Sequence, residues 1–227
     1  MRRLQVRALP GPQRAHRDPE EPVIKTDFKK ELPELFGPPT KDFVQVTVPE
    51  LNFLMIDGMG DPGTAKSYAE ALECLYSVSY ALKFASKKEL EHDYVVPPLE
   101  GLWWADDPAA FVARRRDEWR WAMMIMQPDW ITEGMVTAAI ETSGRKKELP
   151  ALPGLRFDGL LEGLSLQIMH IGSFESEGPT LARLHNEYMP AHGLTFNGPH
   201  HEIYLGDPRK TAPEKLKTIL RQPVKEV

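Results

Sequence analysis

The residues best suited to chemistry lie in segment 200–205, HHEIYL, where one carboxylate stands among residues that favour strands. Side chains alternate between the two faces of an extended chain, so His200, Glu202 and Tyr204 share one face. A carboxylate on a covered face of a sheet costs free energy unless it has a partner. The segment therefore predicts a pocket with Glu202 in its wall.

Glu202 is the first candidate for a catalytic base, because a carboxylate in a pocket can take a proton from a bound water. Tyr204, on the same face, could donate its phenolic proton to a ligand carbonyl. Each residue also has a structural interpretation. Glu202 could be bonded to a neighbouring histidine or tyrosine, and Tyr204 could be a core tyrosine with a bonded hydroxyl. We take Glu202 and Tyr204 as the predicted catalytic residues.

A similar segment, 98–108 or PLEGLWWADDP, stands earlier in the chain, and both segments run from glutamate through aromatic residues to Asp-Pro. Upstream of each, a strand-like run ends in glycine and a helix opens beside proline and threonine. This repetition predicts a duplication, with halves at about residues 42–130 and 160–222. We therefore predict an α+β fold of two pseudo-twofold βαββ modules, with helices on one side of the sheet and a ligand cleft on the other.

Periodicity places the expected elements. A long helix is predicted over 65–86, where apolar residues recur every three or four positions and Cys74 is expected to be a packing residue. Further helices are expected over 132–147, 179–189 and 213–220. Strands are predicted over 43–48, 51–60, 94–96, 99–105, 117–127, 164–171 and 200–205.

Aromatic residues are candidates for the walls of the pocket. Trp103 and Trp104 point to opposite faces of a regular strand, so at most one of them lines the pocket directly. Aligning the two repeats favours Trp104. Trp130 and Tyr68 could also bind the ligand, although both fit packing in the core.

Glu100 and His170 complete the predicted ligand-binding residues. Glu100 matches Glu202 in the repeat, so it could cross the same cavity, or it could bond loop amides near Gly101. His170 ends a strand and could orient a ligand or Glu202, or it could be a partly exposed histidine at a strand end. The histidines lack the spacing of a metal site, and no nucleotide-binding or serine-hydrolase motif occurs, so we predict no metal and no cofactor.

Composition indicates the compartment of the protein and the kinds of partner that it can bind. The chain has 227 residues, a formal charge of -5 and one cysteine, which favours a reducing cytoplasm over a disulfide-forming compartment. No apolar run has the length of a membrane span, so we predict no membrane association. The acidic balance disfavours direct nucleic-acid binding. The first 17 residues hold five arginines and no acid, and we predict that residues 1–22 form a disordered basic leader before one domain over 23–227.

A set of separate motifs runs through the chain: NFLMIDG at 52–58, VPPLEGLWW at 96–104, MMIMQP at 123–128, HIGSF at 170–174 and HHEIYLGDPR at 200–209. Together they resemble the GyrI-like small-molecule-binding family over about residues 23–224. Within this family, the motifs are similar to a stand-alone branch in which some members hydrolyse cyclopropane-bearing, DNA-alkylating natural products. The resemblance implies a pocket at the pseudo-twofold junction, with an inward glutamate and aromatic walls.

The resemblance also implies several functions. The first is a cofactor-independent hydrolase that opens a strained cyclopropane ring in hydrophobic aromatic metabolites and so detoxifies them. The alternative is a non-catalytic binder or sensor of lipophilic, often cationic, small molecules. A third is interaction with a topoisomerase, because the family includes an inhibitor of such an enzyme. Since one fold hosts all three, the site has to distinguish them.

Overall fold

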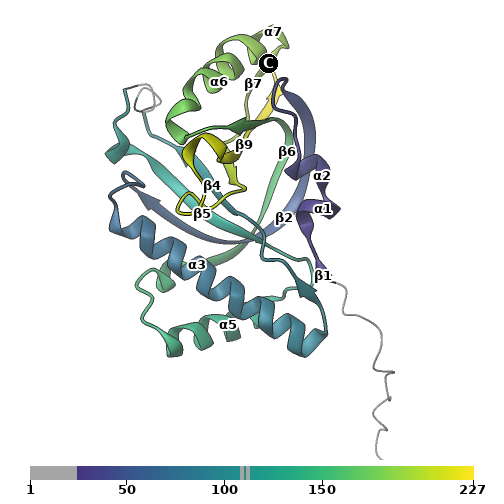
Figure 1. The fold of residues 1–227 in the computed structure, drawn as a ribbon, viewed down its shortest axis with the longest axis vertical. Coiled ribbons are helices and arrows are strands. Elements are labelled where there is room, and N and C mark those ends of the chain that lie inside the picture. The colour runs from purple at the N-terminus through teal and green to yellow at the C-terminus, as the bar shows by residue number, and fades with distance from the viewer. Residues whose placement is uncertain (1–24, 108–109, 111–112) are drawn as a thin grey trace, which may run out of the picture.

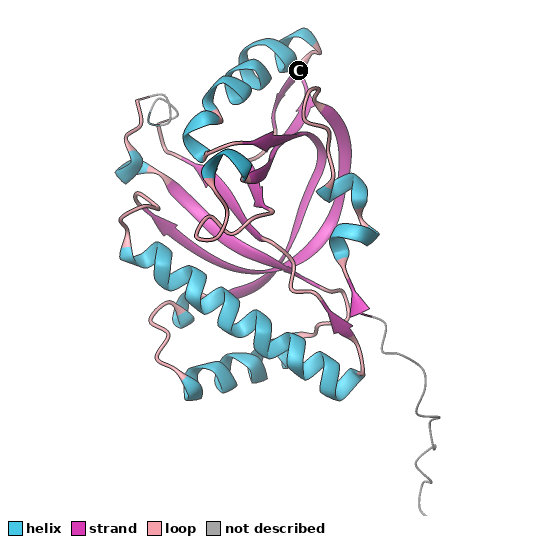
Figure 2. Ribbon diagram, in the orientation of Figure 1, coloured by secondary structure: helices cyan, strands magenta, loops and turns pink. Residues whose placement is uncertain are grey.

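The computed structural model describes residues 25–107, 110 and 113–227, which fold around one large sheet (Figure 1; coloured by element type in Figure 2). The predicted basic leader lies outside the described residues. The strands are β1 (Lys25–Thr26), β2 (Val44–Met59), β3 (Asp93–Tyr94), β4 (Leu99–Trp104), β5 (Arg120–Gln127), β6 (Arg156–Ile171), β7 (Leu194–Phe196), β8 (His200–Tyr204) and β9 (Lys217–Glu226).

The helices are α1 (Phe28–Glu31), α2 (Pro33–Phe36), α3 (Lys66–Ala85), α5 (Glu133–Lys146), α6 (Gly178–Arg183) and α7 (Met189–Ala191). The π turns are η1 (Ser86–Leu90) and η5 (Leu184–Tyr188). The 3-10 turns are η2 (Arg116–Glu118), η3 (Leu152–Gly154), η4 (Phe174–Ser176) and η6 (Pro213–Lys215). Within the described residues, none of the helices combines the length and the apolar character needed to cross a membrane.

The main sheet closes on itself. Its strands run in the order β6-β2-β5-β4-β8-β9-β7, and β6 also pairs with β9, so all of these strands except β7 form a barrel. Exchanging β2 with β6, β4 with β8 and β5 with β9 reproduces the same order, as expected for two βαββ units related by a pseudo-twofold axis. The predicted α+β fold is confirmed, and the closure of its sheet is an additional finding.

Helices cover the outside of the barrel in two layers (Figure 1). α3, with α5 beside it, packs on β2 and β5 around buried residues that include Leu54, Trp121 and Ile125. α6, η5 and α7 pack on β6 and β9 around Leu166 and Leu220. A third apolar cluster lies on the opposite face of the strands, inside the barrel. The outer face of β4 and β8 is therefore left between the two helical layers.

α3 forms as its periodicity predicts. The side chains that it buries recur at three- and four-residue steps and face the sheet: Ala71, Cys74, Leu75, Val78, Ser79 and Leu82. Burial raises the pKa of the Cys74 thiol to about 11, so this residue is a packing group without thiolate character at neutral pH.

The helix predicted over 213–220 is wrong. Pro213–Lys215 forms only the turn η6, and the chain then enters β9. β9 pairs with β6, β7 and β8, and its central residues are buried on both faces. A strand buried on both faces shows no alternation of apolar and polar residues, so its periodicity did not distinguish it from a short buried helix.

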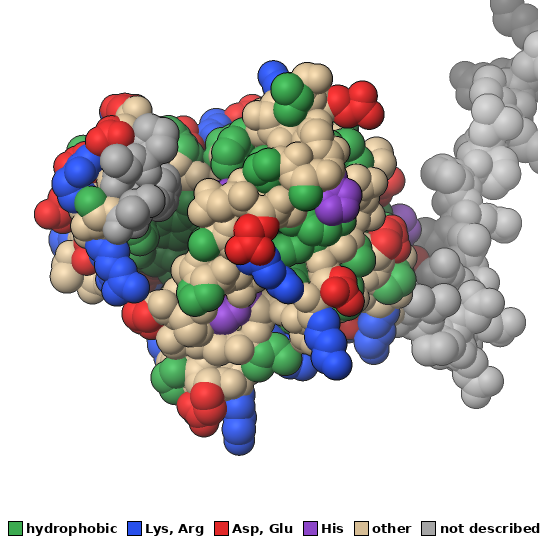
Figure 3. Space-filling model, turned by 90° about the horizontal axis from the view of Figure 1, so that it is seen from above, with side chains coloured by type: hydrophobic (Ala, Val, Ile, Leu, Met, Phe, Trp, Pro, Cys, Tyr) green, Lys and Arg blue, Asp and Glu red, His purple; other side chains and the backbone are tan. Residues whose placement is uncertain are grey.

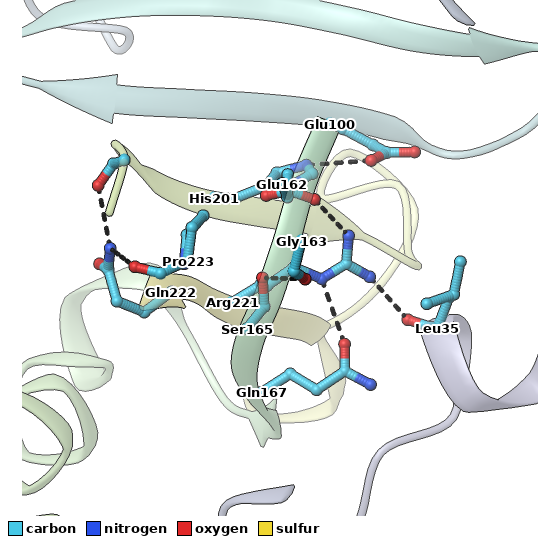
Figure 4. A network of polar contacts seen from close by, with 11 residues as sticks. Leu35, Glu100, Glu162, Gly163, Ser165, Gln167, His201, Arg221, Gln222 and Pro223 are labelled. Atoms are coloured by element: carbon cyan, nitrogen blue, oxygen red, sulfur yellow. Dashed lines mark hydrogen bonds and ion pairs between the residues drawn. The ribbon is translucent and has the colours of Figure 1, made fainter. Parts of the chain in front are cut away.

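Charged side chains cross the inside of the barrel in a buried network (Figure 4). His201 on β8 lies between two carboxylates, with Nε2 2.9 Å from Glu100 Oε2 and Nδ1 2.9 Å from Glu162 Oε1. Arg221 on β9 donates from Nη1 to Glu162 Oε2 over 2.8 Å. Each of these four side chains belongs to a residue that is at most 7% exposed. Two carboxylates and two cations therefore balance one another inside the barrel.

The network also fastens the segment before β2 to the barrel. Arg221 Nη2 donates to the carbonyl of Leu35 over 3.0 Å, and the Gln167 amide donates to the carbonyl of Glu34. Both carbonyls belong to α2, a helix too short to hold its place by its own hydrogen bonds. The charged core thus positions α2 as well as the strands.

We expect the protein to lose stability as the pH rises from about 6.5 to about 9. Burial lowers the pKa of His201, but Glu162 and Glu100 outweigh this effect and raise it to about 9. A raised pKa in the folded state gives stability that is complete below the ordinary value of 6.5 and is lost as the pH passes 9. The loss should reach about 3 kcal/mol in the free energy of unfolding, measured with urea at each pH. A free energy that stays constant over this range would contradict the assignment.

Candidate functional site

The predicted catalytic residues lie on the outer face of β4 and β8, which is the face that carries the helices and not the opposite face, where the cleft was predicted. In the register between the strands, Glu202 pairs with Gly101 and Tyr204 pairs with Leu99, so both side chains point away from the barrel interior. The intervening Ile203 packs inside the barrel. The Glu202 side chain is 14% exposed, so it is neither sealed in the core nor open to bulk solvent.

Glu202, Tyr204 and Trp103 form a chain of hydrogen bonds across the two strands. Tyr204 Oη donates to Glu202 Oε2 over 2.8 Å, and Trp103 Nε1 donates to Tyr204 Oη over 2.9 Å. Burial, and then the Glu202 carboxylate, raise the pKa of Tyr204 well above its ordinary value. The phenol therefore keeps its proton at neutral pH and directs it at the carboxylate. Because β4 and β8 belong to different halves, the chain exists only where the halves meet.

Aromatic rings from both βαββ units wall this chain of hydrogen bonds. Tyr68 on α3 and Trp119 before β5 lie with their ring centroids 6.3 Å and 6.1 Å from that of Trp103. On the other side, Phe174 of η4 packs edge-on against Tyr204 with centroids 5.7 Å apart. Seen from above, a hollow with largely hydrophobic walls opens between the tips of β4 and β5 and the lobe that carries α6 (Figure 3). This hollow, called the cleft below, suits a flat aromatic ligand.

A second carboxyl group, Glu177, lies beside this site and was not predicted. It is 4% exposed and stands immediately before α6. Burial, and then the Glu202 carboxylate, raise the pKa of Glu177 to about 9, so at neutral pH this side chain holds a proton. The sequence contains one signal for it, because in both halves an acid, Asp61 or Glu177, precedes the residues that open the helix.

The expectation that Trp104 rather than Trp103 faces Glu202 is wrong. Trp103 pairs with His200 on the face of Glu202, whereas Trp104 packs against the cluster inside the barrel. Aligning the repeats misleads here because Glu100 and Glu202 point to opposite faces of the paired strands. A shift of one residue in register exchanges the two faces of a strand.

Glu100 and Trp130 lie away from Glu202. Glu100 forms an ion pair with His201 inside the barrel, so the prediction that it crosses the same cavity as Glu202 is wrong. Trp130 packs edge-on against Tyr94, with ring centroids 6.1 Å apart, and belongs to the cluster under α3 and α5. Both residues therefore have structural partners in place of a ligand.

His170 holds part of the cleft wall in place. Its Nε2 lies 3.3 Å from the Ser173 carbonyl oxygen and 3.0 Å from Ser176 Oγ, which ties the end of β6 to η4. η4 carries Phe174, so His170 supports the ring that packs on Tyr204. Among the described residues, no group of three or more histidine, cysteine, aspartate and glutamate side chains could hold a metal ion.

Replacing Gly101 with alanine is expected to disturb the hydrogen-bonded chain. A Cβ at this position would lie 2.9 Å from Trp103 Nε1 and 3.2 Å from Tyr204 Oη, so both groups must move. We expect G101A to weaken binding of a flat aromatic ligand about tenfold and to destabilise the fold by about 1–3 kcal/mol. Quenching of tryptophan fluorescence measures the affinity. Gly154 has no atom within 4 Å of an added Cβ, so G154A is the matched control. Equal affinities of the two variants would show that the gap at Gly101 is not needed.

Comparisons with solved structures identify near relatives. An uncharacterized conserved protein from Listeria innocua is 40% identical, with a TM-score of 0.81 over 88% of this chain and 100% of its own. A hydrolase from Listeria innocua is 39% identical, with a TM-score of 0.80 over 89% of this chain and 100% of its own. The C-terminal domain of EcmrR, at 10% identity and a TM-score of 0.51 over 82% of this chain and 98% of its own, shares the fold alone.

The family assignment rests on a match that spans most of the chain. The model of the GyrI-like small molecule binding domain matches residues 41–225, which include both βαββ units and every residue of the cleft described above. No curated protein matched the chain. The protein belongs to the GyrI-like family of small-molecule-binding domains.

Proposed function

We propose that the protein is a cofactor-independent hydrolase that opens a strained cyclopropane ring in hydrophobic aromatic, DNA-alkylating metabolites. The observation that carries this proposal is the chain from Trp103 through Tyr204 to Glu202, which sets a phenol and a carboxylate side by side in an aromatic cleft. The description of a 39% identical relative as a hydrolase supports an enzymatic role. The role would be detoxification in the cytoplasm, which the low cysteine content favours.

The chemistry requires one base and one proton donor. In a cyclopropane conjugated to a dienone, water attacks the strained CH2 carbon, and the ring C–C bond breaks. The bonding electrons move to the carbonyl oxygen, which gains a proton and becomes a phenol. Glu202 takes the proton of the attacking water, and Tyr204 turns its hydroxyl from Glu202 to the carbonyl oxygen and delivers its proton there. The product contains one added water.

The hydrogen bond between the two residues restores the resting state. After turnover Glu202 is protonated and Tyr204 is a phenolate, and the 2.8 Å contact lets the proton return to the tyrosine. Glu177, which its raised pKa keeps neutral at pH 7, adds no second negative charge beside Glu202. The aromatic walls would stack the flat substrate and exclude bulk water.

A second candidate function uses the same cleft without chemistry. A carboxylate beside Tyr68, Trp103 and Phe174 is a counter-charge within a cage of rings, which suits lipophilic cations. In this alternative Glu202 neutralises the ligand and no bond is broken.

Mass spectrometry of the protein incubated with a cyclopropapyrroloindole compound tests the proposal. We expect many ligand molecules per protein to gain one water each. Stoichiometric recovery of unchanged ligand would contradict the enzyme and support the binder. A pull-down that recovers a topoisomerase, unaffected by changes in the cleft, would contradict both and support the third function implied by the family.

A further inference from the structure

Two histidines beside Glu202 have buried ring nitrogens without partners. His200 opens β8 on the face of Glu202, and its Nε2 lies 3.5 Å from Glu202 Oε1 without forming a hydrogen bond. His185 lies on η5, with its ring centroid 6.4 Å from that of His200. His185 Nε2 and both ring nitrogens of His200 are buried and have no hydrogen-bond partner among the described residues.

Unpaired polar atoms of this kind point to a ligand. Buried donors and acceptors in folded proteins are nearly always bonded, because leaving one unpaired costs free energy. Here three such atoms lie in one cluster, and the cluster borders the carboxylate of the proposed site. A ligand group that reached past Glu202 would supply the missing partners.

The backbone around His185 is irregular in a way that suits a site. η5 is a π turn between α6 and α7, and π turns in helices are rare and often occur where side chains are functional. Phe196, at the end of β7, packs against His185 with ring centroids 5.0 Å apart and is itself 50% exposed. The cluster therefore has an apolar, solvent-facing side next to its polar one.

Charge restricts the group that this cluster can accept. Burial, and then His200, lower the pKa of His185 to about 4, so its ring is neutral at pH 7 and offers one donor and one acceptor. A hydrogen bond between this ring and the Gln222 side chain opposes the shift only in part and engages one ring nitrogen, which leaves Nε2 for a ligand. The nearby Glu202 carboxylate disfavours an anion. A neutral group that both donates and accepts hydrogen bonds fits these conditions.

We propose that His185, His200 and Phe196 form a polar subsite of the cleft, which binds a neutral hydrogen-bonding substituent, such as a carboxamide, on an aromatic ligand. This inference rests on the proposed function, because it takes the outer face of β4 and β8 as the ligand site. The subsite would select among flat aromatic molecules by the substituent at one end. It would serve a hydrolase and a binder equally.

Two inert probes test the subsite without any turnover. Acridine-9-carboxamide and 9-methylacridine share one ring system and differ in the hydrogen-bonding group. We expect the wild-type protein to bind the carboxamide about tenfold more tightly, as a gain of about one hydrogen bond implies. The ratio of the two dissociation constants should fall to about one in H185F and in H200F, which keep a ring but lose the nitrogens. Calorimetric titration measures each constant.

The control is H192F, at an exposed histidine that stacks on Tyr188 with ring centroids 4.0 Å apart. This variant should keep the wild-type ratio. Equal binding of the two probes by the wild-type protein, or a preference that survives in both H185F and H200F, would overturn the subsite and leave the proposed function intact. Failure of the wild-type protein to bind either probe would overturn both, because the cleft would then not accept a flat aromatic molecule. Thermal unfolding of each variant shows whether a lost preference reflects a lost fold, and H185L and H200L, which also lack a hydrogen-bonding group, then replace the phenylalanine variants.

Discussion

Replacing Glu202 with glutamine is expected to lower the turnover of a cyclopropapyrroloindole compound by about a hundredfold or more, with the compound still bound. Glutamine keeps the shape of the side chain and can still accept the hydrogen bond from Tyr204, but it cannot take a proton from water. Mass spectrometry of the product that has gained one water gives the rate, and quenching of tryptophan fluorescence gives the affinity. The expected result is a loss in kcat with a dissociation constant within a few-fold of the wild type.

The matched control is E214Q, at an exposed position on η6. It makes the same chemical change away from the cleft and should leave the rate unchanged. Wild-type turnover by E202Q would show that Glu202 is not the base. If the wild-type protein itself binds the compound without adding water, the binder remains, and E202Q should then weaken the binding of a lipophilic cation such as tetraphenylphosphonium, whose counter-charge it removes.

Replacing Glu162 with leucine is expected to destabilise the fold by about 3–5 kcal/mol. Glu162 is the shared partner of His201 and Arg221, and both cations contact it within 2.9 Å. Burial raises the pKa of Glu162, but His201 and Arg221 outweigh this effect and lower it to about 2, so the carboxylate is charged at any pH at which the protein is handled. Removing it leaves Arg221 as an unpaired charge in the barrel. Urea unfolding followed by fluorescence measures the loss.

Two further variants show whether the lost free energy of unfolding comes from the unpaired buried charge. The double variant with Glu162→Leu and Arg221→Met removes both members of the pair, and we expect it to be more stable than E162L alone, because no lone charge remains. E141Q breaks the exposed contact between Glu141 and Arg145, 3.8 Å apart, and should change the free energy by less than about 0.5 kcal/mol. A loss in E162L no larger than that in E141Q would contradict a role of the buried charges in stability.

The sequence predicted much of this arrangement from simple periodicity. Alternation along 200–205 placed Glu202 and Tyr204 on one face, and the three- and four-residue steps of α3 located both the helix and its buried side. The duplication was also visible, because each half repeats the same order of strand, glycine, helix and Glu-containing strand. These signals are local, and each depends on residues that lie close together in the chain.

Apart from the helix expected over 213–220, the failures concern relations between distant segments. Which of Trp103 and Trp104 faces the cleft depends on how β4 meets β8, and this register cannot be read from either strand alone. The raised pKa of Glu177 comes from burial and from Glu202 on β8, which the neighbours of Glu177 in the chain do not indicate. The charged network inside the barrel escaped notice because Glu162, His201 and Arg221 are spread over three strands that become adjacent only when the barrel closes.

The cleft lies where β4 pairs with β8, so neither βαββ unit contains a complete cleft. Trp103 comes from the first unit, and Tyr204 and Glu202 come from the second. A ligand in the cleft therefore contacts both units and holds them together. Thermodynamic linkage then requires a bound ligand to oppose separation of the units, by a free energy that grows with the logarithm of the ligand concentration relative to its dissociation constant. A bound ligand of this protein therefore also stabilises the contact between its two units.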